Sequence, residues 1–328
     1  MKDSAIKEYI KVKTEGILNL ETLSNEYGMT AEELVGFHNQ CCSASELLTV
    51  SLPKYVEYIY IPSDKYQVRD IRLLKNTGIE IPKNVSKKVY GVIIKFLPKN
   101  LQIHYKIKVK RTEAYIELIK EKTYVNNQEV DKIIEQLFEK AEKVLYPLQI
   151  STDSNGAIRK ILNHESIAER WKTECLPNLK EYYQSEITDQ ILDQLDKSYS
   201  DIDSKKDLFG RNLFYKLFFL PVYQNYPFFF RKDRLEVYFS SLSRKVGYDV
   251  EYILSKEYTK GNRIALKIAG TEEEELFNKN RRKGKVELLY KFDQETKEIF
   301  SITGYLITFN KEQEYTVDFQ VYEQNRPE

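Results

Sequence analysis

Cysteine and histidine are scarce in this sequence, and their positions do not indicate a cross-linked or metal-stabilised fold. The 328 residues include three cysteines, of which Cys41 and Cys42 are adjacent and Cys175 is distant. This spacing is not that of a disulfide framework, so we expect reduced thiols. None of the three histidines lies at ligand spacing to a cysteine pair, which argues against zinc, and we expect no cofactor. The histidines are His38, His104 and His164.

The sequence also lacks an excess of charge and any long apolar run. Fifty-one basic and fifty acidic residues leave a formal charge of +1, so no global field favours nucleic acid or anionic lipid. No run is long enough for a membrane-spanning helix, and residues 1–8 lack the apolar segment of a secretory signal. We therefore expect a cytoplasmic protein, unless a secretion machine delivers it outward, with protein partners and no nucleic acid.

The first sixty residues have the pattern of two helices between two short strands. The strands are expected at 9–12 and 58–62. Between them, Leu20, Leu23 and Tyr27 recur at spacings of three and four, which places them on one helix face. This order predicts a small βααβ module.

Local signals set the boundaries of these two helices. Gly28 can adopt the left-handed conformation that ends the first helix. Thr30 is a favourable N-cap for the second helix, and Glu33 three residues later completes a capping box. The second helix carries Leu34 and Phe37 toward the core.

These residues together resemble the core pattern of the LysM family, over residues 8–62. Family members most often bind N-acetylglucosamine-containing glycans such as peptidoglycan or chitin. They also act as protein-docking modules in phage-tail-like baseplates and contractile injection (type VI secretion) systems. The resemblance therefore implies a binding module rather than a catalyst. It is carried by Leu20, Leu23, Ser24, Tyr27, Gly28, Met29, Thr30, Leu34 and Asn39.

The resemblance also implies a binding groove between two loops. Its lining would be Gly16, Ile17, Leu18, Asn19, Leu47, Leu48 and Thr49. Two departures from the family pattern bear on its ligand. The usual Gly-Asp-Thr is replaced by Ile-Leu-Asn at 17–19, and the usual Pro-Gly-Gln is replaced by the longer segment 52–57. These more apolar loop tips favour a protein contact over a sugar.

The rest of the chain has the pattern of an α+β domain. We interpret 63–88 as a linker, with one possible strand at 68–74, and 89–328 as a larger domain with a helical middle at 129–220. Runs that alternate apolar and polar residues precede and follow those helices. We predict a mostly antiparallel, curved sheet around central helices, similar to a half-barrel. The expected strands are 90–94, 102–110, 114–125, 235–240, 246–256, 262–269, 285–292, 298–309 and 314–322.

Turn and helix signals divide the helical middle. Ser154-Asn155-Gly156 predicts a hairpin turn between strands at 148–151 and 157–162. Asn163 is expected to cap a helix that runs through Tyr183, although Pro177 would kink or split it. Further helices are expected at 130–145, 185–199 and 203–220.

Residues 213–230 are crowded with aromatic side chains. Two interpretations remain open: the rings fill the core between helices and sheet, or they form an exposed anchor for a protein partner. The residues of this second candidate interface are Phe218, Phe219, Tyr223, Tyr226, Phe228 and Phe229.

Two charged clusters are expected to be solvated rather than functional. One is the helix face with Glu186, Asp189, Asp193 and Asp196, and the other is the loop 272–285. No phosphate-binding loop, nucleophile elbow or catalytic triad is recognisable by spacing. We therefore expect no catalytic residues and no metal ligands.

The sequence thus favours a non-enzymatic adaptor or chaperone. A LysM-like module would dock onto a protein assembly, such as the spike, baseplate or effector of a bacterial contractile injection system, and the larger domain would hold a second partner. Two alternatives stay open. The protein could bind peptidoglycan glycan, or it could be a toxin effector whose enzymatic part is the C-terminal domain.

Overall fold

The computed structural model describes residues 9–14, 19–48, 52–53, 56–63, 74, 76–129, 132–259, 261–273 and 282–324. The predicted strand at 68–74 lies outside these residues except for its last position. The chain divides into two compact units, which are considered separately below. The smaller unit comprises residues 1–75 and 256–264, and the larger comprises 76–255 and 265–328.

The smaller unit contains two helices and a two-stranded antiparallel sheet. Strand β1 (Tyr9–Lys13) pairs with β2 (Tyr58–Pro62), and α1 (Leu20–Glu26) and α2 (Ala31–Cys41) lie between them in the chain. A 3-10 helix (Ala44–Glu46) follows α2. The order of helices and strands is the predicted one.

The predicted helix caps of this unit are confirmed. Gly28 has a positive φ of 65°. The Thr30 hydroxyl accepts a hydrogen bond from the Glu33 N–H at 3.1 Å, and the Glu33 carboxylate accepts one from the Thr30 N–H at 2.8 Å. Asn19 is the N-cap of α1, and its side-chain oxygen accepts from the Thr22 N–H at 2.7 Å.

The core of the smaller unit is mostly apolar and includes the buried polar residues Ser24 and His38. The Tyr60 N–H donates to His38 Nδ1 at 3.1 Å, so Nδ1 is unprotonated and Nε2 donates to the Glu46 carbonyl at 2.9 Å. His38 thereby joins α2 to β2 and to the 3-10 helix. The buried apolar residues are Leu20, Leu23, Tyr27, Met29, Leu34, Leu48, Val56, Ile59 and Ile61.

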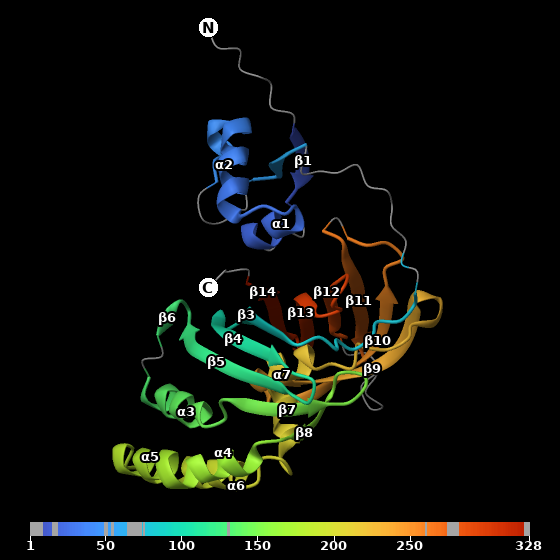
Figure 1. The fold of residues 1–328 in the computed structure, drawn as a ribbon. Coiled ribbons are helices and arrows are strands. Elements are labelled where there is room, and N and C mark those ends of the chain that lie inside the picture. The colour runs from blue at the N-terminus through green and yellow to red at the C-terminus, as the bar shows by residue number, and fades with distance from the viewer. Residues whose placement is uncertain are drawn as a thin grey trace. The chain divides into compact units, whose positions relative to one another are not determined.

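The larger unit is built on a curved sheet of twelve strands, shown in Figure 1. The strand order is β8-β7-β5-β4-β3-β14-β13-β12-β11-β10-β9, and the short β6 pairs with β5. All registers in the described residues are antiparallel. The predicted mixed helix and strand class with a large curved antiparallel sheet is therefore confirmed. The strands are β3 (Ser86–Leu97), β4 (Leu101–Arg111), β5 (Ile116–Val125), β6 (Gln128–Glu129), β7 (Leu148–Thr152), β8 (Ile158–Ile161), β9 (Phe230–Phe239), β10 (Arg244–Leu254), β11 (Arg263–Glu272), β12 (Lys285–Asp293), β13 (Ile299–Asn310) and β14 (Gln313–Glu323).

The chain enters this sheet in the middle and returns to the middle. From β3 it proceeds to the β8 edge, crosses through the helices to the opposite edge at β9, and comes back through consecutive strands to β14. There β14 pairs with β3, with Val321 opposite Val92. The first and last strands of the unit, which are far apart in sequence, thus pair with each other in the middle of the sheet.

One helix of the larger unit precedes β7, and the others lie between β8 and β9. They are α3 (Ile133–Lys143), which precedes β7, then α4 (His164–Arg170), a π-helical turn (Trp171–Cys175), α5 (Leu176–Tyr182), α6 (Glu186–Tyr199), a 3-10 helix (Lys206–Arg211) and α7 (Leu213–Phe218). Pro177 lies at the start of α5, where a missing N–H is tolerated, and the irregular turn precedes it.

The prediction that Asn163 caps the following helix is wrong for its side chain. Its amide oxygen accepts from the Gln149 N–H at 2.9 Å, and its amide nitrogen donates to the Pro147 carbonyl at 2.7 Å. Asn163 therefore ties the start of β7 to the start of α4, and leaves the helix without a side-chain cap.

Helix α7 packs on one face of the sheet, which we call the inner face. The rings of Phe214 and Tyr105 lie 6.3 Å apart, and those of Phe218 and Tyr90 lie 5.2 Å apart. The Tyr290 hydroxyl on β12 donates to the Leu217 carbonyl at 2.8 Å. Alternate residues of the strands supply this face, as the period-two patterns predict.

Candidate functional site

A cavity of about 500 Å³ lies in the larger unit, against the inner face of the sheet. Its walls come from β3, β4, β5, β9, β13 and β14, and from α3 and the start of α7. The volume falls within the range of small-molecule sites. Its apolar lining is Ile94, Phe96, Ile103, Tyr105, Val125, Phe138, Leu213, Val237, Phe239, Leu306 and Val317.

A lysine of β5 lies in this apolar wall, and a bulge in the strand follows it. Tyr105 is paired with Thr123, whereas Ile107, two residues further along β4, is paired with Lys120, so β5 contains one extra residue. Thr123 and Lys120 consequently both line the cavity. The Lys120 ammonium lies 4.4 Å from the centre of the Tyr105 ring and 2.6 Å from a Glu142 carboxylate oxygen.

Helix α3 contributes a row of acids to the same cavity. Glu135, Glu139 and Glu142 follow the spacing of one helix face. Each has a lysine near its carboxylate: Lys132 at 3.2 Å, Lys143 at 3.9 Å and Lys120 at 2.6 Å, respectively. Each acid of this cavity therefore has a lysine within 4 Å.

A half-buried and a buried tyrosine lie next to Glu142. The hydroxyls of Tyr146 and Tyr215 are hydrogen-bonded at 2.7 Å, and Tyr146 also donates to Glu142 at 3.5 Å. Burial raises the pKa of both phenols well above the ordinary value for tyrosine. Both groups consequently stay neutral and act as hydrogen-bonding residues.

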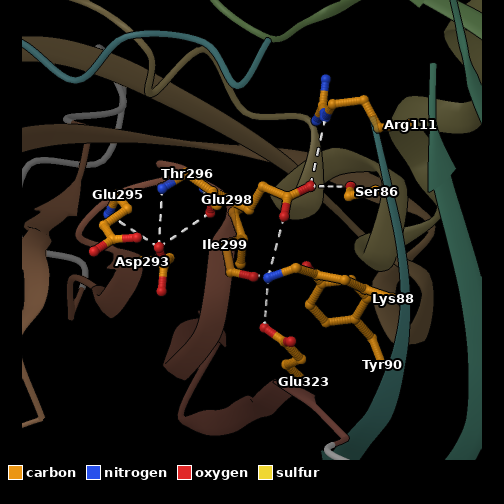
Figure 2. Close-up of polar contacts among 10 residues, drawn as sticks. All are labelled: Ser86, Lys88, Tyr90, Arg111, Asp293, Glu295, Thr296, Glu298, Ile299 and Glu323. Atoms are coloured by element: carbon orange, nitrogen blue, oxygen red, sulfur yellow. Dashed lines mark hydrogen bonds and ion pairs between the residues drawn. The ribbon is translucent and has the colours of Figure 1, made fainter. Parts of the chain in front are cut away.

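A second polar cluster lies where β3, β4, β14 and the turn before β13 meet, as Figure 2 shows. The buried Glu298 carboxylate accepts a hydrogen bond from Ser86, lies 3.2 Å from Lys88 Nζ, and lies 3.8 Å from Arg111 Nε. Lys88 also donates to Glu323 at 2.7 Å. Two carboxylates and two cations thus compensate one another.

This second cluster has the geometry of a structural cross-link. The adjoining void measures about 20 Å³, close to the space of a single water molecule. The Tyr90 hydroxyl donates to the Ile299 carbonyl at 2.7 Å in the same region. Asp293 closes the turn by accepting from the Glu295 and Thr296 N–H groups at 3.0 and 2.9 Å.

The predicted groove of the smaller unit is described only in part. Gly16, Ile17, Leu18 and Thr49 lie outside the described residues. Asn19 is occupied as the cap of α1, and Leu48 is buried. Leu47 is 46% exposed, and the loop that carries it is tied down because the Asn39 amide exchanges two 2.8 Å hydrogen bonds with the Leu48 backbone.

The aromatic stretch 213–230 is divided between core and surface. Phe218, Phe219, Tyr223 and Tyr226 are buried, which is the first of the two interpretations left open by the sequence. Phe228 is 93% exposed. It and the half-buried Phe229 have positive φ values of 55° and 64°, uncommon for aromatic residues.

The two charged clusters also differ from each other. In the helix face on α6, Asp196 accepts from Trp171 Nε1 at 2.8 Å, so it supports the core rather than facing only solvent. Glu272 was expected in a solvated loop, and this expectation is wrong. Its side chain is buried and accepts from the Gly284 N–H at 3.0 Å and from the Thr308 hydroxyl at 3.1 Å.

Sequence patterns missed the cavity and the charges around it. Lys120 and Glu298 come from elements distant in sequence from their partners, and no motif links them. The only local signal was Lys120 in an otherwise alternating strand.

In the described part of the chain, no three His, Cys, Asp or Glu residues are grouped so that they could hold a metal ion. No described helix has the length and apolarity needed to cross a membrane.

Comparison of the chain with protein-family models, with curated proteins and with solved structures finds no match. The resemblance to LysM modules therefore remains a prediction, supported by the residues that carry it.

Proposed function

We propose that this protein is a non-enzymatic adaptor. The smaller unit docks onto a protein assembly, and the larger unit carries a second partner in the cavity on its inner sheet face. The observation that supports this most directly is the cavity of about 500 Å³, because its wall is mostly apolar and its acids are paired. Such a site is suited to holding a ligand.

The surface near Leu47 supports docking by the smaller unit. Leu47 is exposed on a loop whose backbone is fixed by Asn39. The backbone of this loop is already ordered before binding. Binding a protein through Leu47 therefore costs little additional conformational entropy of the loop, which favours the contact. The LysM resemblance suggests the assembly: the spike, baseplate or effector of a cytoplasmic contractile injection system.

The docking role is tested by recovering partners of the tagged full-length chain from the native host, with Leu47→Asp beside it. Ile187→Asp is the matched control, because Ile187 is an exposed apolar residue of α6 in the other unit. We expect Leu47→Asp to lose spike, baseplate or effector proteins that Ile187→Asp retains, read by mass spectrometry. Equal partner sets for both variants contradict the proposal. Retention on isolated peptidoglycan that only Leu47→Asp abolishes would instead indicate a glycan-binding protein.

A further inference from the structure

A second cavity, of about 400 Å³, adjoins the apolar one and differs from it in charge. It is framed by the 3-10 helix at Lys206–Arg211, by α7 and by β9. Three cations and two carboxylates line it, whereas the larger cavity has a mostly apolar wall. The charged residues are Arg211, Lys216, Lys245, Asp207 and Glu236.

Two of these cations, Arg211 and Lys216, form no ion pair within the part of the chain that the structure describes, although the Glu236 carboxylate acts to raise the pKa of Lys216. Lys245 is paired with Glu236 at 2.7 Å. The Arg211 guanidinium lies over the Tyr238 ring, 5.4 Å from its centre. Within the described ranges, neither Arg211 nor Lys216 makes an ion pair or a side-chain hydrogen bond. Burial lowers the pKa of Lys216, so holding its ammonium charged there is costly, and a bound anion would offset that cost.

The two cavities share part of their wall. Arg211 and Tyr238 line both of them. A ligand that occupies both therefore passes this pair, with one end among apolar side chains and the other beside Arg211 and Lys216. Each acid of the apolar cavity has a lysine within 4 Å, and the three cations of the smaller cavity exceed its two carboxylates by one formal positive charge.

We propose that the two cavities form one binding site for a single-chain amphiphile with a carboxylate head group. Its hydrocarbon chain lies in the apolar cavity, between the sheet and α3. Its carboxylate lies in the smaller cavity, against Arg211 and Lys216, where a guanidinium and an ammonium provide charge-assisted hydrogen bonds. The inference rests on the proposed carrier role of the larger unit and names the chemistry of what that unit carries.

The site is tested by isothermal titration of the full-length protein with dodecanoate below its micelle concentration. Dodecyltrimethylammonium, which has the same chain and the opposite charge, is the matched ligand control. We expect one dodecanoate per chain and at least tenfold weaker binding of the ammonium. Within a series from hexanoate to dodecanoate, full burial predicts an affinity gain approaching about fourfold per added methylene.

Variants locate the head group. Arg211→Gln with Lys216→Gln should weaken dodecanoate binding at least tenfold, whereas Lys197→Gln, which removes a lysine of α6 outside both cavities, should leave it unchanged. Equal affinity for the two head groups, unchanged binding by the double variant, or no chain-length dependence would each overturn the inference. The chain-length series uses the unmodified protein, so it stays decisive if the double variant fails to fold.

The ligand site and the docking role are tested by different measurements, so either proposal can fail while the other holds. Loss of partners in Leu47→Asp together with absent dodecanoate binding would retain docking and overturn the ligand site. Dodecanoate binding with unchanged partners in Leu47→Asp would retain the site and overturn the docking.

Discussion

Single charged side chains connect distant strands of the larger unit. Lys88 stands between two carboxylates, Glu298 and Glu323, which belong to segments more than two hundred residues away in sequence. Its ammonium satisfies both at distances of 3.2 and 2.7 Å. Removing one member of such a buried set leaves charge without compensation, which costs more than the set contributes as a whole.

Replacing Lys88 by methionine should therefore destabilise the larger unit by about 3 kcal/mol, because Glu298 and Glu323 would lose their shared cation. Urea unfolding followed by the fluorescence of Trp171 measures this, since Trp171 is the sole tryptophan and is buried in this unit. Lys110→Met, at an exposed position of β4, is the control and should change stability by no more than about 0.5 kcal/mol. Equal midpoints for the two variants would show that the cluster does not act as a cross-link.

Local contacts fix the individual elements of the smaller unit. The loop after α2 has little regular structure, yet the Asn39 amide and the His38 ring bind its backbone at Leu48 and Glu46. These side chains give the loop the order that Leu47 needs as a contact residue.

Asn39→Ala should release the Leu48 segment from α2. Two hydrogen bonds at about 1 kcal/mol each correspond to a roughly 30-fold rise in local opening. Hydrogen exchange of the Leu48 amide measures it, because this N–H donates to Asn39. Glu32→Ala, on the exposed side of α2, should leave the exchange rate of Leu48 nearly unchanged. A Leu48 amide that exchanges equally fast in both variants would contradict this account.

The elements that could be predicted from sequence are those set by neighbours in the chain. The Thr30–Glu33 capping box and the hairpin around Gly156 each depend on a few adjacent residues. The side-chain role of Asn163 and the burial of Glu272 were predicted wrongly because their partners lie elsewhere in the fold. Alternation located the strands, but nothing in it revealed the extra residue in β5 that keeps Thr123 on the same face as Lys120.

At the scale of the whole unit, the strand order could be predicted only where strands follow one another. The pairs from β9 to β14 are consecutive, whereas the contact between β3 and β14 joins the two ends of the unit. Closing so long a loop carries a large entropic cost before any contact forms, and no local pattern encodes it. The apolar cavity is lined by residues of both β3 and β14, so it depends on this pairing and was not predictable.

Deleting residues 313–328 should therefore unfold the larger unit, because β14 lies in the middle of the sheet and is not an edge strand. Trp171 belongs to the distant helical segment and is buried. In the shortened chain we expect its fluorescence spectrum to be that of an exposed tryptophan and to show no cooperative unfolding transition. Deleting 325–328 alone leaves every described strand intact and should preserve both. A shortened chain whose Trp171 unfolds cooperatively at the normal urea concentration would contradict this.

The central position of β14 also constrains how the protein is made. During translation, β3 and β13 are synthesised before the strand that separates them, so each presents an edge of unpaired backbone N–H and C=O groups until β14 leaves the ribosome. Such edges can pair with other nascent chains, which makes the interval before β14 appears the period of greatest risk of aggregation. The pairing of β14 therefore removes two exposed strand edges in a single step.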